Sequence, residues 1–210
     1  MPDYSKPDHW SLKAQKEGYP ARSVYKLKEM DEKFGLIKSG KAPLKILDLG
    51  AAPGSWSLYI LRKFSQLGKS ASALSLVAID LAPLSRSCDQ GLFDSNGFIF
   101  IQGDFTQSEI RENIISKGPY NLIVSDAAPA TSGNRSLDTL RSLDLAETAL
   151  DYAVNAMDRG GNLVIKVFQG GDTASLLKSM RGLFNTAKTF QPQACRKESF
   201  ETYFLGLGKK

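Results

Sequence analysis

The chain alternates between two hydrophobic patterns over most of its length. Short apolar runs, such as 74–79, predict parallel strands covered on both faces, and stretches with apolar residues three or four positions apart predict helices. The predicted strands are 45–49, 74–80, 98–101, 120–125, 161–168, 187–191 and 202–207. The predicted helices are 55–66, a short piece at 84–92, 107–116, 137–158 and 172–184. This alternation predicts an α/β fold with a doubly wound, mostly parallel sheet and helices on both faces.

The last two predicted strands differ from the others, because the segment between them is short and lacks helical periodicity. Such a connection joins antiparallel neighbours. We therefore expect a seven-stranded sheet whose C-terminal strand is antiparallel. The clearest helix, 137–158, has one apolar side and is followed by Gly160 and Gly161, which are expected to end it. Its expected buried residues are Leu140, Leu143, Ala146, Leu150, Val154 and Met157.

Residues 1–44 precede this alternation and are expected to form a helical, basic extension of the same domain, ahead of a main unit at 45–210. Pro20 suits the first turn of a helix that runs to about Phe34. Apolar residues at spacings of three and four predict one buried stripe, made of Val24, Leu27, Met30 and Phe34. Lys26 falls on a different face, where a solvated lysine is the default interpretation.

Length and residue usage limit the possible classes of protein. A chain of 210 residues can bury a full core in one domain. No apolar run is long enough to span a membrane, and the polar start lacks the apolar core of a signal peptide, so we expect a cytoplasmic protein. Cys88 and Cys195 lack metal-binding spacing, and His9 is the only histidine. This disfavours Ser-His-Asp or Cys-His catalysis, and no metal site is expected.

The net charge of +5 is unevenly distributed. Residues 1–45 hold 10 Lys/Arg against 6 Asp/Glu, residues 46–177 hold 10 against 14, and residues 178–210 hold 7 against 2. Two basic ends therefore flank an acidic middle. If the fold brings the ends together, they form a face suited to a phosphate backbone. Charge alone leaves open the alternative that scattered surface lysines only provide solubility.

The stretch 45–57, K-I-L-D-L-G-A-A-P-G-S-W-S, predicts a strand, a small-residue turn and the start of a helix. This arrangement is a common site for a ligand with a nucleoside part, and the glycines from Gly50 to Gly54 let the backbone approach it closely. The turn lacks the G-x-G-x-x-G spacing, and Pro53 removes an N–H that a pyrophosphate would use. Trp56 either packs in the core or lines the ligand pocket.

An acidic residue stands at or near the end of each of four predicted strands: Asp48, Asp80, Asp104 and Asp126. A single such residue is most often a helix cap or a turn former, but four around one glycine turn favour a binding site. An acid after the second strand typically accepts hydrogen bonds from ribose hydroxyls. Several acids repel the phosphates of a dinucleotide and suit a cationic ligand. S-adenosylmethionine, with its sulfonium and ammonium groups, therefore fits better than NAD.

Lys166 lies inside an apolar strand, in L-V-I-K-V-F. Burying an unpaired ammonium group costs several kcal/mol, so this lysine needs a partner unless it is neutral or reaches solvent at the strand end. Asp126 is expected on the neighbouring strand and could be that partner. Glu201, at the start of the last strand, would reach the same edge of the sheet if that strand is antiparallel.

Several motifs in order resemble the FtsJ/RlmE (RrmJ) family of ribosomal RNA ribose 2′-O-methyltransferases. They are S-V-Y-K-L, D-L-G-A-A-P-G-S-W, Q-G-D-F, S-D-A-A-P, V-I-K-V-F-Q-G and E-T-Y, and they cover the chain from about residue 10 to its end. The segment 84–97 is longer than the bacterial pattern of the family. The resemblance implies a single Rossmann-like class I methyltransferase domain that uses S-adenosylmethionine.

The resemblance also implies the residues of the site. A catalytic Lys-Asp-Lys-Glu set falls on Lys26, Asp126, Lys166 and Glu201. Contacts with S-adenosylmethionine fall on Gly54, Trp56, Asp80, Asp104 and Asp126, with Gly50 in the same turn. We hypothesise that Lys166 is the base, that Asp126 orients it, and that Lys26 and Glu201 position the ribose hydroxyl.

The implied substrate is a uridine in the A-loop of large-subunit (23S-type) ribosomal RNA, within the ribosomal subunit, held through the basic N- and C-terminal segments of a monomer. Three other activities stay open. They are a nicotinamide-dependent oxidoreductase, a non-catalytic RNA-binding ribosome assembly factor, and a 2′-O-methyltransferase that acts on transfer RNA or an mRNA cap.

Overall fold

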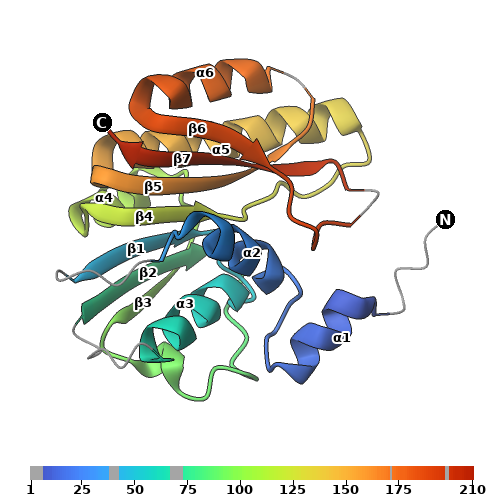
Figure 1. The fold of residues 1–210 in the computed structure, drawn as a ribbon, viewed down its shortest axis with the longest axis vertical. Helices are drawn as coiled ribbons and strands as arrows, with labels where there is room; N and C mark the ends of the chain where they lie inside the picture. Colours follow the sequence, from blue (N-terminus) through green and yellow to red (C-terminus); the bar gives the residue numbers. More distant parts are fainter. Residues whose placement is uncertain (1–6, 38–42, 67–72, 171, 197–198) are drawn as a thin grey trace.

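The computed structural model describes residues 7–37, 43–66, 73–170, 172–196 and 199–210 (Figure 1). Its elements are a central sheet, surrounding helices and one short 3₁₀ helix, η2. In chain order they are α1 (His9–Lys16), α2 (Val24–Phe34), β1 (Leu44–Leu49), α3 (Ser55–Gln66), β2 (Leu74–Asp80), η2 (Leu92–Asp94), β3 (Phe98–Gln102), α4 (Ser108–Ser116), β4 (Tyr120–Ser125), α5 (Arg135–Ala156), β5 (Met157–Phe168), α6 (Thr173–Leu183), β6 (Phe184–Phe190) and β7 (Glu201–Lys209).

The seven strands form one sheet in the order β3-β2-β1-β4-β5-β7-β6. Strands β1 to β5 pair in parallel, and β7 pairs antiparallel with both β5 and β6. This confirms the predicted mixed sheet and the antiparallel C-terminal strand. The strand order reverses between β1 and β4, so their carboxyl ends border a crevice where ligands bind in folds of this type.

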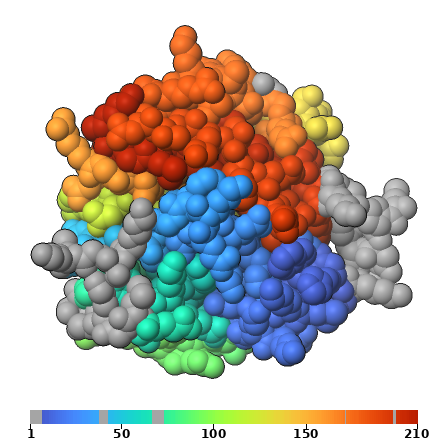
Figure 2. All heavy atoms as spheres, in the orientation of Figure 1, coloured from blue at the N-terminus to red at the C-terminus, as the bar shows by residue number. Residues whose placement is uncertain are grey.

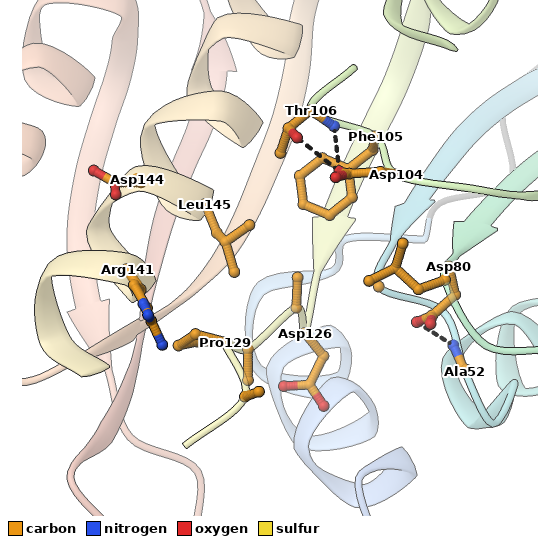
Figure 3. Close-up of a pocket in the computed structure, with 15 residues that line it drawn as sticks. Ala52, Asp80, Asp104, Phe105, Thr106, Asp126, Pro129, Arg141, Asp144 and Leu145 are labelled. Carbon is orange, nitrogen blue, oxygen red and sulfur yellow. Dashed lines mark hydrogen bonds between the residues drawn. The ribbon is translucent and has the colours of Figure 1, made fainter. Parts of the chain in front are cut away.

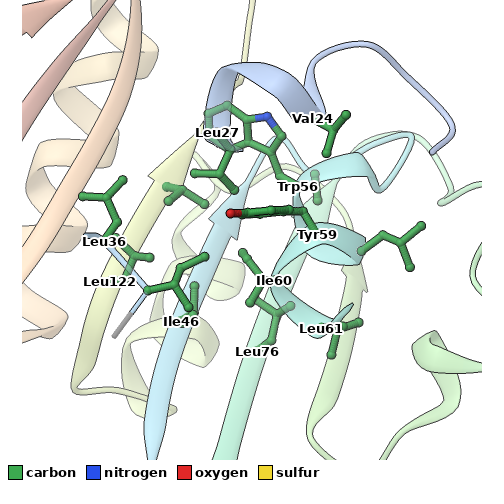
Figure 4. Packing of buried hydrophobic residues seen from close by; sticks show 14 of the residues in the cluster. Val24, Leu27, Leu36, Ile46, Trp56, Tyr59, Ile60, Leu61, Leu76 and Leu122 are labelled. Carbon is green, nitrogen blue, oxygen red and sulfur yellow. The ribbon is translucent and has the colours of Figure 1, made fainter. Parts of the chain in front are cut away.

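Two hydrophobic layers cover the sheet, one on each face. Consecutive residues of β1 point to opposite sides, so that Ile46 joins the cluster with α1, α2 and α3, while Leu47 joins the cluster with α4, α5 and α6. Figure 4 shows the first layer, in which Leu27 of α2 and Trp56 of α3 pack above the sheet. Within the described residues, no helix is long and apolar enough to cross a membrane.

The predicted short helix at 84–92 is wrong. The segment is a loop that ends in η2, and its backbone cannot continue a helix because Gln90 and Gly91 have φ values of 51° and 80°. The loop packs against the glycine turn, where the Ser85 N–H donates to the Pro53 carbonyl at 2.9 Å. The loop therefore supports the glycine turn from outside.

The predicted buried side of α5 is only partly right. Ala146 and Met157 are buried and Leu143 and Leu150 are partly buried, but Leu140 and Val154 are 55% and 52% exposed, respectively. The buried positions of α5 are mostly small or polar, and small residues let the long helix lie close to the sheet; the buried residues are Asp138, Thr139, Ser142, Ala146, Ala149, Tyr152, Ala153 and Ala156. Gly160 and Gly161 do not end the helix but lie within β5, which begins directly after Ala156.

The N-terminal helix α2 begins at Val24, so Pro20 precedes the helix rather than occupying its first turn. The predicted stripe is confirmed, with Val24, Leu27 and Met30 fully buried and Phe34 partly buried. The solvated position expected for Lys26 is wrong, because this side chain is only 8% exposed. It is buried because α2 carries a second contact face toward the C-terminal part of the chain, beside which it lies in Figure 2.

Candidate functional site

A cavity of about 560 Å³ lies at the carboxyl ends of β1 to β4 (Figure 3). Figure 3 shows Asp80 and Asp104 on one side of it and Arg141 and Asp144 of α5 on the other. The lining residues combine carboxylates with apolar walls, and they are Gly50, Ala52, Asp80, Leu81, Asp104, Phe105, Thr106, Asp126, Ala127, Ala128, Pro129, Ala130, Arg141, Asp144 and Leu145.

The glycine turn forms one wall of this cavity. Gly50 has a φ of 74°, and a Cβ at this position would lie 2.6 Å from the Ala127 Cα, so only glycine fits. The Asp80 carboxylate closes the turn, since it accepts hydrogen bonds from the N–H groups of Ala52 at 2.9 Å and Ala82 at 2.8 Å. Asp80, the last residue of β2, thus holds the turn after β1 in place and also lines the cavity.

The other predicted cofactor residues lie in different environments. Asp104 lines the cavity, and its Oδ1 accepts hydrogen bonds from the N–H and hydroxyl of Thr106 at 2.9 and 2.7 Å. Gly54 and Trp56 are not among the described residues that line the cavity. The Trp56 side chain is 2% exposed, and its Nε1 donates to the Ser23 carbonyl at 2.8 Å, which favours the core-packing alternative.

Asp48 lies inside β1 rather than at its open end, and the expectation that it belongs to the ring of acids is wrong. Its side chain is fully buried beneath the site, where Oδ2 accepts a 2.6 Å hydrogen bond from the Ser57 hydroxyl. Its Oδ1 has no hydrogen-bond partner within the described structure. Burial raises the pKa of Asp48 to about 7, with a further contribution from the charges of Asp126 and Asp80.

The cavity fits a cationic nucleoside such as S-adenosylmethionine. Three carboxylates, from Asp80, Asp104 and Asp126, face a volume large enough for a small-molecule ligand. Leu81 and Phe105 provide apolar surface. Within the described ranges, no group of three or more His, Cys, Asp or Glu side chains could hold a metal ion.

Asp126 and Lys166 form a buried ion pair at one end of the cavity. The Lys166 Nζ lies 3.1 Å from the Asp126 Oδ1 and also donates to the Asp126 backbone carbonyl. The Tyr203 hydroxyl donates to the same Oδ1 at 2.6 Å. Burial alone would raise the pKa of Asp126, but the ammonium groups of Lys166 and Lys26 and the hydrogen bond from Tyr203 outweigh it and lower that pKa.

Lys26 and Glu201 form a second ion pair, with 2.8 Å between Nζ and Oε1 and with side chains 10% and 12% exposed. Burial acts to lower the pKa of Lys26, but the carboxylates of Asp126 and Glu201 outweigh it, so the pKa is raised. Glu201 reaches the site because β7 is antiparallel to β5, where it stands opposite Phe168. The structure therefore brings together all four residues of the predicted catalytic set.

Three neighbours of this set have no role in the sequence-based hypothesis. Tyr203 is fully buried, and burial together with the nearby Asp126 carboxylate raises its pKa well above the ordinary value. Cys195 is half-buried beside Glu201, and burial raises the pKa of its thiol to about 12. Arg22 donates to the Ala194 carbonyl. The E-T-Y motif contains Tyr203, and Arg22 stands one helical turn before Lys26, so both had a signal in the sequence.

A second cavity, of about 260 Å³, opens beside Lys26 and Glu201. It joins the start of α2 to the segment before β7, and its lining residues are Arg22, Ser23, Lys26, Ala194, Arg196, Ser199 and Glu201. Residues of the two basic ends of the chain thus meet at the ion pairs. The cavity has the positive side chains that an anionic ligand requires.

Comparison with known proteins agrees with the ligand that the geometry of the cavity suggests. Residues 19–209 match the model of a family described as FtsJ-like methyltransferase. The proteins named Ribosomal RNA large subunit methyltransferase E from Treponema denticola and Borreliella afzelii are 47% and 42% identical to this chain. The alignments cover 99% of this chain and 97% of the first relative, and 95% of this chain and 96% of the second.

Among solved structures, a crystal structure of a ribosomal RNA methyltransferase from Plasmodium falciparum has the same fold. It superimposes with a TM-score of 0.71 at 24% identity and covers 91% of this chain and 98% of its own.

Proposed function

The chain belongs to the FtsJ-like methyltransferase family, and on this basis we propose that it transfers a methyl group from S-adenosylmethionine to a ribose 2′-hydroxyl in RNA. Family membership confirms the predicted Rossmann-like methyltransferase class and S-adenosylmethionine as the methyl donor. The observation that carries the choice of acceptor is the buried Lys166–Asp126 pair at the end of the acidic cavity. A hydroxyl acceptor needs a group that takes its proton, and a buried lysine beside the donor site can supply one.

Gly50, Asp80, Asp104 and Asp126 would hold the donor in the cavity that they line. When bound, S-adenosylmethionine supplies an electrophilic methyl group on a sulfonium centre. Asp80 suits ribose hydroxyls, because its carboxylate is fixed by two backbone N–H groups. In this proposal Gly54 and Trp56 do not contact the donor but support the cavity wall, and Trp56 fixes α3 against Ser23.

In the proposed reaction, the ammonium group of Lys166 first releases a proton to solvent, and its Nζ then accepts the proton of the 2′-hydroxyl. At the same time the hydroxyl oxygen bonds to the methyl group and the bond between sulfur and methyl breaks. Asp126 holds Lys166 through its side chain and its backbone carbonyl, so that the amine stays beside the residue that lines the cavity. Lys26 and Glu201 position the hydroxyl from the second ion pair. Fixing the two reactants in this way can contribute much of the rate enhancement.

Ribosomal RNA of the large subunit is the proposed substrate, because the curated relatives are named for it. A uridine of the A-loop within the subunit is the specific target that we propose. The basic extension 1–44 and the C-terminal segment would face the RNA, and Arg22 and Arg196 border a cavity suited to a phosphate beside the reacting ribose. In this proposal the protein acts as a monomer in the cytoplasm.

The test is methyl transfer by the purified protein with S-adenosylmethionine and large ribosomal subunits from a strain that lacks this gene. Mapping of ribose methylation should give one new 2′-O-methyl uridine in the large-subunit RNA. Methylation only of transfer RNA or of a capped RNA would contradict the proposed substrate. Tight RNA binding without any transfer would support the assembly-factor alternative, and binding of NAD in place of S-adenosylmethionine would support an oxidoreductase.

A further inference from the structure

A third cavity, of about 410 Å³, lies where α5 begins and β5 ends. The proposed reaction assigns no role to its lining residues, which are Arg135, Ser136, Thr139, Leu140, Gln169 and Gly170. The cavity combines an apolar side chain, a guanidinium group, two hydroxyls and a primary amide. This composition is typical of sites for a flat, partly polar ligand such as a nucleobase.

Leu140 provides the apolar surface of this cavity. Its side chain is 55% exposed and lines the cavity from the first turns of α5. The neighbouring residues Arg141, Asp144 and Leu145 line the donor cavity. The first turns of α5 therefore separate the two cavities and present Leu140 to the one that has no assigned ligand.

Arg135 and Gln169 supply the polar part of the cavity and are held by their surroundings. The Arg135 guanidinium lies 5.0 Å from the centre of the Phe200 ring. The Phe200 ring packs edge-on against the Phe168 ring, with 4.7 Å between the ring centres. The Gln169 N–H donates to the Phe200 carbonyl at 2.7 Å. Within the described structure, the Gln169 amide side chain has no hydrogen-bond partner, and it lies exposed at the cavity. A planar cation and an amide edge are thus available to a ligand.

The cavity is also close to the proposed reaction centre. Gln169 follows Lys166 by three residues at the end of β5, a distance of about 10 Å along an extended chain. Phe200 immediately precedes Glu201, which belongs to the second ion pair. The Ser142 hydroxyl accepts a hydrogen bond from the Phe168 N–H at 3.0 Å and so fixes α5 against this end of β5. The cavity and Lys166 therefore belong to the same end of β5, where we expect the substrate nucleotide and its neighbours to bind.

We propose that this cavity binds an unstacked nucleobase of the substrate RNA, carried by the methylated nucleotide or by its direct neighbour. The inference rests on the proposed function and adds to it a recognition site for single-stranded RNA. Leu140 covers one face of the base, Arg135 contributes cation–π attraction and charge, and Gln169 hydrogen-bonds to the edge of the base. Single-stranded loops are the parts of an RNA whose bases can be displaced in this way.

The test compares Leu140→Ser and Gln169→Ala with Val154→Ser, a matched control that is 52% exposed on the same helix and outside the cavities. Methyl transfer to large ribosomal subunits should show a KM about 5- to 10-fold higher for the two cavity variants, because losing contact with one base typically weakens binding by this order. The affinity for S-adenosylmethionine and the melting temperature should match those of the unaltered protein. A wild-type KM in both cavity variants would overturn the proposal.

A second measurement separates this proposal from the proposed function. RNA that carries 4-thiouridine at and beside the target nucleotide is irradiated with the unaltered protein, and the attached peptides are identified. Attachment within 135–140 or at Gln169 supports the base site even if no methyl transfer is detected, in which case only the proposed reaction fails. Attachment exclusively elsewhere, in a protein that does transfer methyl groups, overturns the base site and leaves the reaction intact.

Discussion

Lys166 and Tyr203 stand opposite each other on the antiparallel strands β5 and β7, and both contact the same carboxylate oxygen, Oδ1 of Asp126. The two contacts measure 3.1 and 2.6 Å. Strand register therefore aligns an ammonium donor and a hydroxyl donor on one acceptor. Because all three side chains are largely buried, their arrangement depends on the sheet rather than on solvent-exposed loops.

Lys166→Ala should abolish methyl transfer and leave binding of S-adenosylmethionine intact. Loss of a general base typically lowers a rate by about 10²- to 10⁴-fold. The rate of methyl transfer in single-turnover experiments measures the first effect, and isothermal titration with S-adenosylmethionine measures the second. Lys45→Ala is the matched control, since the Lys45 Nζ also donates to backbone carbonyls, those of Lys117 and Gly118, but at the opposite end of the sheet. Retained turnover in Lys166→Ala would exclude Lys166 as the base.

Gly50→Ala should weaken donor binding by more than 10-fold and destabilise the protein. The new Cβ would lie 2.6 Å from the Ala127 Cα in the cavity wall, and the φ of 74° is strained for alanine. Gly160→Ala separates the two causes, because Gly160 has a similar φ of 77° but open space around it. The control should lose only about 1–2 kcal/mol of unfolding free energy. Equal effects of both changes on donor affinity would contradict this interpretation.

The Lys26–Glu201 pair should show positive coupling in a double-mutant cycle. Removing one partner, as in Lys26→Met or Glu201→Gln, leaves the other charged side chain largely buried without its ion-pair partner. Each single change should lower the unfolding free energy by roughly 1–3 kcal/mol, and the double variant should lose less than the sum. Urea unfolding of the unaltered protein, the two single variants and the double variant measures the unfolding free energies. The exposed Arg86–Asp94 pair is the control and should show no measurable coupling.

Asp48 should make stability fall as the pH rises. Burial raises its pKa to about 7, well above the value of an unfolded aspartate, so the folded state holds a proton that the unfolded state releases. The contribution of Asp48 to unfolding free energy is therefore fully present below about pH 4, is lost between about pH 4 and 7, and is constant above that range. A shift of this size corresponds to a total of about 4 kcal/mol.

Urea unfolding between pH 5 and 8 tests this effect. Asp48→Asn should show a flatter pH profile than the unaltered protein, because the amide does not titrate. Asp94→Asn, at a position whose side chain is 66% exposed, should keep the original slope. Parallel profiles for the unaltered protein and Asp48→Asn would show that Asp48 ionises in the folded state as readily as in the unfolded chain.

The sequence by itself determined the strands, most of the helices and the edge of the sheet that carries the site. Continuous apolar runs end at Asp80 and Asp126, and a lysine inside such a run requires an acidic partner, so Asp126 and Lys166 could be paired from the pattern alone. These inferences need only the alternation of strand and helix, which places consecutive parallel strand ends at one edge. The family motifs then added Lys26, whose position on its helix had suggested a solvated side chain.

Only the tertiary structure decided which helix faces are buried and which distant residues meet. Lys26 is buried because the C-terminal part of the chain covers the second face of α2, and Tyr203 contacts Asp126 because of its register with Lys166. On α5, Leu140 and Val154 suggested a core face but are exposed, since close packing against the sheet favours smaller residues. Hydrophobic periodicity describes one element at a time. The partner of each face depends on contacts between segments far apart in the chain, which no local pattern encodes.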